Sequence, residues 1–125
     1  KKDMDISELQ RIYAGHPNTK GLAALLEDSS VRTIFLGGLH ASATPLFISS
    51  FIRENKQTFV FILGDQEEAG YFYHDLTQVN GEENILFFPS SYRRAIKYGQ
   101  KDAANEILRT EVLSRLPKRL FHKKN

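Results

Sequence analysis

The sequence predicts an α/β fold, a three-layer parallel sheet with helices on both faces. Three short apolar runs, at 31–36, 58–63 and 84–88, have the length and the β-branched and aromatic content of strands. Segments with apolar residues at helical spacing lie between these runs and after the last one. Because strands that alternate with helices usually form a parallel sheet with right-handed crossovers, we expect that topology here.

Composition places the chain among ordinary globular proteins. It has 125 residues, of which 41% are hydrophobic and 26% charged, which suits one domain with a single core. The absence of cysteine excludes disulfides and thiolate metal sites. The apolar runs are far shorter than the roughly 20 residues of a membrane span, and no secretory signal is apparent. We therefore expect a cytoplasmic protein with no membrane partner.

Charge is unevenly distributed along the chain. Residues 1–92 contain seven Lys and Arg against twelve Asp and Glu, a net charge of −5, whereas residues 93–125 contain ten against three, a net charge of +7. A basic end can attract nucleic acid through phosphate contacts. It is equally compatible with a linker, and the segment 117–125 is interpreted as a basic tail or linker.

Residues 1–30 are expected to form a helical lead-in to the main domain at 31–116. A first helix is predicted over about 7–13 and a second around Leu22, Leu25 and Leu26. His16 and Pro17 separate them, because a residue before proline avoids the α region. His16 is interpreted as structural.

Three further helices are predicted between and after the strands. The first covers 41–53, with Pro45 in its first turn, where a missing N–H is tolerated. The second covers roughly 66–79 behind a capping box made by Asp65 and Glu68. The third covers 102–116. The strand at 58–63 is apolar after its first residue, which suits a parallel strand covered on both faces.

The turn after the first strand has the outline of a phosphate-binding loop, G-x-x-x-x-G-K-[ST]. Gly38 holds the first glycine position, Ala43 the second, Thr44 the lysine position and Pro45 the hydroxyl position. Thr44 carries no charge for a phosphate and Pro45 has no hydroxyl for a magnesium ion. We therefore expect this degenerate loop to bind no nucleotide and to catalyse no hydrolysis. A plain strand–helix turn would explain the glycines equally well.

Other candidate site residues are interpreted conservatively. Carboxylates crowd the start of the helix at 66–79 and its middle, with His74 beside Asp75; the carboxylates are Asp65, Glu67, Glu68 and Asp75. Capping and solvation explain them better than catalysis, because neighbours on a helix point about 100° apart. A possible nucleic-acid or partner surface is formed by four cations, Arg93, Arg94, Lys97 and Lys101.

Four motifs in order resemble the N-terminal, UvrB-like region of bacterial transcription-repair coupling factors (Mfd). The first is Leu36-Gly37-Gly38-Leu39-His40-Ala41-Ser42-Ala43, and the second runs from Leu63-Gly64-Asp65 through Ala69 to Asp75-Leu76. The third is Phe88-Pro89-Ser90. The fourth is the arginine-bearing helix from Asn105 to Leu116, preceded by Lys101-Asp102-Ala103-Ala104-Asn105-Glu106, which is similar to a stretch of the excision-repair helicase UvrB. The resemblance covers about residues 31–116.

This resemblance implies a P-loop NTPase, RecA-like domain (UvrB-like domain 1A) with a degenerate nucleotide loop. It implies a non-catalytic scaffold in transcription-coupled nucleotide excision repair, supporting recruitment of UvrA and restraining the other domains of the same chain. ATP, magnesium, DNA and RNA polymerase are implied only for the full-length protein, whose ATP-dependent DNA translocase lies downstream. Two alternatives stay open: a working nucleotide-binding or hydrolase domain with a non-standard loop, and a nucleic-acid-binding module that uses the basic C-terminal third.

Overall fold

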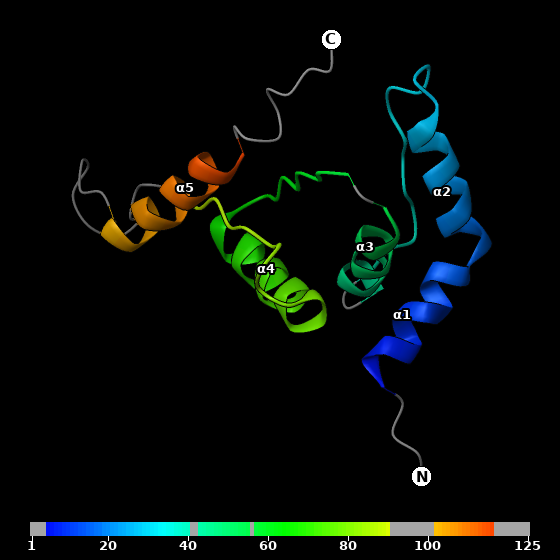
Figure 1. Cartoon of the computed structure of the whole chain (residues 1–125), viewed down its shortest axis with the longest axis horizontal. Helices are drawn as coiled ribbons and strands as arrows, with labels where there is room; N and C mark the ends of the chain where they lie inside the picture. The colour runs from blue at the N-terminus through cyan, green and yellow to red at the C-terminus, as the bar shows by residue number, and fades with distance from the viewer. Residues whose placement is uncertain (1–4, 41–42, 56, 91–101, 117–125) are drawn as a thin grey trace.

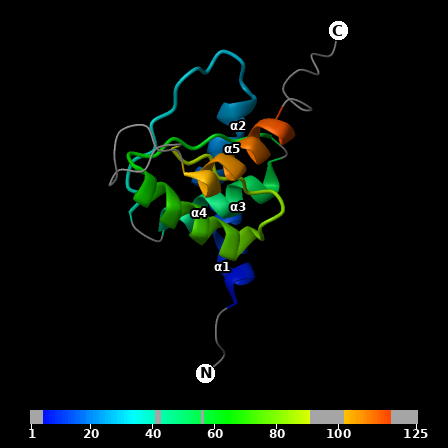
Figure 2. The ribbon, with the colours of Figure 1, turned by 90° about the vertical axis from the view of Figure 1, so that its left-hand side faces the viewer.

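A computed structural model describes residues 5–40, 43–55, 57–90 and 102–116, and this part of the chain contains five helices (Figure 1). They are α1 (Ile6–Gly15), α2 (Pro17–Glu27), α3 (Ala43–Glu54), α4 (Gln66–Asn80) and α5 (Ala103–Arg115). In Figure 1, α3 lies between the α1–α2 pair and α4, and α5 lies beyond α4. The side view in Figure 2 has α4 and α5 in front of α3.

The predicted three-layer parallel sheet is wrong. The described residues form five helices joined by irregular segments, and they contain no strand. The segments 31–36, 58–63 and 84–88 have no regular secondary structure. Among the described residues, no backbone hydrogen bond joins one of these segments to another. The P-loop NTPase, RecA-like fold expected from the resemblance is corrected with it, because that fold requires the sheet.

The apolar runs are only partly covered by the helices. Ile34 and Phe59 lie against the core, whereas Phe35 and Ile62 are 92% and 93% exposed. An uninterrupted apolar run such as 58–63 is typical of a strand covered on both faces. Such a run favours extended backbone locally, but pairing with a second strand depends on residues distant in the sequence. That distant partner is what the sequence pattern could not supply.

The predicted helices are confirmed, with ends that differ by a few residues. The lead-in consists of α1 and α2, separated at His16 as expected. His16 has φ −67° and ψ 138°, and its Nδ1 accepts a hydrogen bond from the backbone N–H of Asn18 at 3.1 Å. Pro17 occupies the first turn of α2, where its fixed φ suits the helix.

The core lies between α2 and α3 and extends into the 57–63 segment. Leu22, Phe47 and Phe51 are buried together. From Phe51 a row of aromatic contacts continues to Phe59, at 5.6 Å between ring centroids, then to Phe61 and finally to Phe72 of α4. The 57–63 segment therefore joins α3 to α4 through its rings.

A polar contact fixes α1 against α3. The side chain of Gln10 is buried at 4% exposure, and its Nε2 donates to Oγ of Ser49 at 3.2 Å. Its Oε1 accepts from Nη1 of Arg53. Ser49 in turn donates to the carbonyl of Leu46 at 2.9 Å. The nitrogen and the oxygen of this buried amide thus each have a hydrogen-bond partner on α3, as buried polar groups require.

The predicted cap of α4 by Asp65 is confirmed, and the returning bond from Glu68 goes to Gly64, one residue before the N-cap. Oδ1 of Asp65 accepts from the N–H of Glu68 at 2.9 Å, and Oε2 of Glu68 accepts from the N–H of Gly64 at 3.0 Å. The helix ends at Gly81, whose φ of 78° is a left-handed value that glycine adopts without strain.

None of the helices in the described ranges is both long enough and apolar enough to cross a membrane.

Candidate functional site

The turn that begins after the 31–36 segment leads directly into α3. Gly38 has φ +82°, so the chain reverses there in a conformation that favours glycine. The carbonyl of His40 accepts from the N–H of Ala43 at 3.1 Å, at the start of α3. Pro45 is buried in the first turn of the helix, as expected from its position. The degenerate loop therefore still precedes a helix N-terminus.

A groove of about 630 Å³ lies beside this turn, between α3 and α4. Its better-covered walls are mainly apolar and come from the turn, from α3, from the 57–63 segment and from α4; they are Leu39, Pro45, Ile48, Leu63 and Phe72. The side chains of Phe61 and Ile62 complete its apolar lining. Its volume is within the range of small-molecule pockets, although it is open along its length.

The polar side chains of the groove include two carboxylates. Glu68 and Asp75 line it from α4, seven residues apart and therefore about two turns along the same face. His40 and Tyr71 are also exposed at its rim. Among the described residues that line it, there is no lysine or arginine.

This arrangement suits a cationic or apolar ligand better than a phosphate. A phosphate at the N-terminus of α3 would meet the helix dipole favourably, but two carboxylates of the same groove would repel it. In a working phosphate loop a lysine neutralises this charge. In the described ranges, no group of three or more His, Asp and Glu side chains is arranged to hold a metal ion.

The sequence-based candidates are distributed unevenly over the structure. Thr44 and Pro45 of the degenerate loop line the groove, Gly38 shapes the turn before it, and Ala43 starts α3. The four cations proposed as a nucleic-acid or partner surface, Arg93, Arg94, Lys97 and Lys101, lie outside the described residues.

Two lining residues, Glu68 and Asp75, belong to the four carboxylates that the sequence pattern explains by capping and solvation. Glu68 does cap α4, and it also lines the groove. The heptad spacing between them was the available signal, because residues seven apart lie on one face of a helix.

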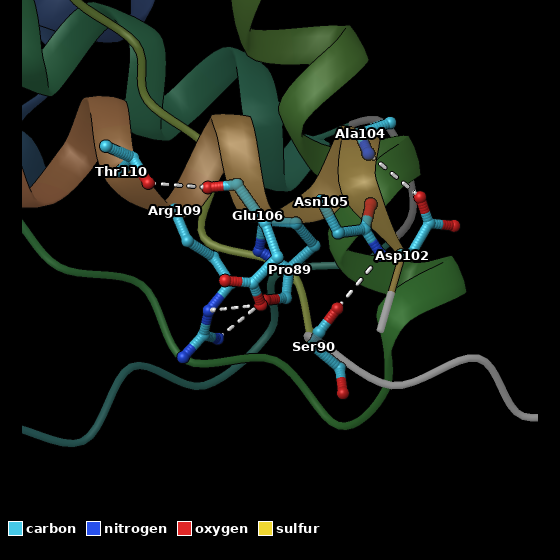
Figure 3. A network of polar contacts seen from close by, with 8 residues as sticks. All are labelled: Pro89, Ser90, Asp102, Ala104, Asn105, Glu106, Arg109 and Thr110. Carbon is cyan, nitrogen blue, oxygen red and sulfur yellow. Dashed lines mark hydrogen bonds and ion pairs between the residues drawn. The ribbon is translucent and has the colours of Figure 1, made fainter. Parts of the chain in front are cut away.

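A second polar site joins α5 to the end of the 84–90 segment (Figure 3). Nδ2 of Asn105 donates to the carbonyl of Ser90 at 2.9 Å, and Nη1 of Arg109 donates to the carbonyl of Pro89 at 2.8 Å. The guanidinium of Arg109 also lies 4.1 Å from the ring centroid of Phe88. This site serves to attach α5, because its donors are occupied by backbone carbonyls.

Comparison of the chain with models of protein families, with curated proteins and with solved structures finds no match.

Proposed function

We propose that this chain is a non-catalytic part of a transcription-repair coupling factor and acts as a scaffold in transcription-coupled nucleotide excision repair. In this role it supports recruitment of UvrA and restrains other domains of the same polypeptide. RNA polymerase and DNA are partners at the level of the full-length protein. Its place of action is the cytoplasm.

The four-motif resemblance supports the family assignment. Two of those motifs contact each other in the structure, because Asn105 and Arg109 of the fourth bind the carbonyls of Pro89 and Ser90 in the third. A second pair is also close: the turn of the first motif and the helix of the second form the two sides of the groove. Motifs that meet in space are easier to explain as one functional unit than as four coincidences.

The observation that carries the non-catalytic role is the charge of the groove beside the degenerate loop. The position of the phosphate-binding lysine is held by Thr44, and Glu68 and Asp75 face the same space. An approaching nucleotide triphosphate would therefore meet two negative charges and no lysine or arginine within the described lining.

The scaffold role is supported by the exposed apolar side chains of the extended segments. Phe35, Val60 and Ile62 are between 76% and 93% exposed. Val60 and Ile62 lie two residues apart in one extended segment, and neighbouring exposed apolar residues often belong to contact surfaces. We assign this region to contacts with other domains of the parent polypeptide.

Isothermal titration calorimetry of the chain with MgATP tests the catalytic part of the proposal. No heat of binding is expected up to millimolar nucleotide. The matched variant Thr44→Lys restores the cation alone, and it should still bind weakly because Pro45 supplies no metal ligand. Micromolar affinity of the unmodified chain for MgATP would overturn the proposal.

The family assignment has its own test, which is the gene sequence that follows residue 125. The proposal predicts helicase motifs far downstream, including an intact G-x-x-x-x-G-K-[ST] loop. A gene without them would refute membership in this family while leaving the calorimetric result valid.

A further inference from the structure

We infer that the basic segment 117–125 of this chain docks into the groove between α3 and α4. The inference concerns a contact within the chain, and it does not depend on the repair role proposed above. Charge and reach both support it.

Charge complementarity identifies the occupant. The groove carries the carboxylates of Glu68 and Asp75 and, among its described lining residues, no lysine or arginine. The segment 117–125 has the opposite composition, with four lysines and arginines and no acidic residue. Opposite charges on facing surfaces favour the correct alignment of two segments and disfavour alternatives.

The apolar parts match as well. Leu120 and Phe121 stand in the middle of the segment, with basic residues on both sides. The groove has an apolar lining that includes Ile48, Phe61 and Phe72, with its carboxylates on the α4 side. A segment with an apolar centre and basic flanks can therefore bury its centre and pair its flanks, which a purely polar tail could not do.

The described part of the chain ends near α4, the helix that carries both carboxylates. Nη2 of Arg115 donates to the carbonyl of Glu83 at 2.6 Å, which holds the end of α5 near the turn that follows α4. Along α4, Asp75 and Glu68 lie about 7.5 Å and about 18 Å before Asn80 at 1.5 Å per residue. Nine extended residues span up to about 30 Å, which is longer than the roughly 18 Å of helix between Asn80 and Glu68.

Covalent attachment makes a weak contact sufficient. Exposed ion pairs contribute little individually. A short flexible tether, however, presents its segment at an effective concentration on the order of millimolar. The docked state should thus be populated at low salt and lost at high salt, since exposed charges are screened.

A spin label on the full chain tests the inference directly. The chain has no cysteine, so Asn125→Cys provides a single attachment site for a nitroxide. Amide signals of Leu63, Tyr71 and Asp75 are expected to broaden in the labelled protein. Raising the ionic strength from about 0.01 M to about 1 M shortens the screening length from about 30 Å to about 3 Å, so the broadening should fall more than about twofold.

Charge reversal identifies the surface. Asp75→Lys should reduce the broadening severalfold, whereas the matched variant Glu82→Lys, which changes the same charge on the turn after α4, should leave it unchanged. Asp75→Asn provides a milder variant if the lysine disturbs folding, which the dispersion of the amide spectrum reports. Glu68 is not reversed, because its side chain caps α4.

Three results would overturn the inference. The first is no broadening at the groove at low salt. The second is broadening that both Asp75 variants leave unchanged. The third is equally strong broadening when isotope-labelled chains without a nitroxide are mixed with unlabelled chains that carry one, because the occupant would then be a second copy.

Discussion

Replacing Phe51 and Phe35 by alanine in turn separates the helical arrangement from a sheet covered on both faces. Phe51 is 3% exposed in the core, and its ring contacts those of Phe47 and Phe59 at centroid distances of 6.3 and 5.6 Å. Phe35 is 92% exposed. The two substitutions remove the same atoms from opposite environments.

The expected costs differ severalfold. Phe51→Ala removes a buried ring and leaves a cavity, which costs about 3–5 kcal/mol of unfolding free energy. Of this, each aromatic contact accounts for about 0.5–1.5 kcal/mol. Phe35→Ala should change stability by less than about 0.5 kcal/mol, since almost all of its surface is already in water. The stability of a small domain is on the order of 5–15 kcal/mol, so the first variant is strongly destabilised.

Urea denaturation followed by circular dichroism measures both values. With a slope of about 2 kcal/mol per molar urea, Phe51→Ala should lower the midpoint by about 2 M. The midpoint of Phe35→Ala should differ from that of the unmodified chain by no more than a few tenths of a molar unit of urea. A cost above about 1 kcal/mol for Phe35→Ala would refute the reasoning, because Phe35 would then be covered in solution.

Three further predictions follow from the same contacts. Amide protons of 59–62 should exchange with solvent far faster than those of α3, as measured by hydrogen exchange, because they have no backbone partner in the described structure; strong protection would contradict this. Gln10→Ala should cost about 1–3 kcal/mol in thermal or urea unfolding, since it breaks hydrogen bonds to Ser49 and to a guanidinium, whereas the exposed Gln78→Ala should cost almost nothing. The Ser30 hydroxyl, followed by its backbone N–H, holds the pKa of Asp28 below its ordinary value, so Ser30→Ala should raise that pKa in a carbon-detected NMR titration. Because the folded-state pKa is lowered, this pair stabilises the fold above the unfolded pKa and loses its effect as pH falls through the folded one; an unchanged pKa would refute the pairing.

The helices could be predicted from the sequence because their signals are local. Apolar spacing, the proline after His16 and the capping pair of Asp65 and Glu68 all act within a few residues, and each is found where expected. The sheet prediction was wrong because strand pairing does not depend on local signals. The runs at 31–36 and 58–63 each place one apolar side chain against the core, Ile34 and Phe59, but a ladder needs a partner strand that no local pattern specifies.

The site was only partly predictable. The turn at Gly38 and the missing cation at Thr44 could be recognised residue by residue against a known loop. The acidic character of the groove could not, because Asp75 and Thr44 are distant in the sequence and meet only through the packing of α4 beside α3.

The attachment of α5 has a consequence for which substitutions this chain can accept. Asn105, Arg109 and Arg115 each donate to a backbone carbonyl, those of Ser90, Pro89 and Glu83. A carbonyl is supplied by any amino acid, so the accepting positions can change their side chains and keep the bond. The donors cannot, since only a long or amide-bearing polar side chain reaches across. Tolerance to mutation should therefore be one-sided, with α5 restricted at its three donor positions and position 83 free to change.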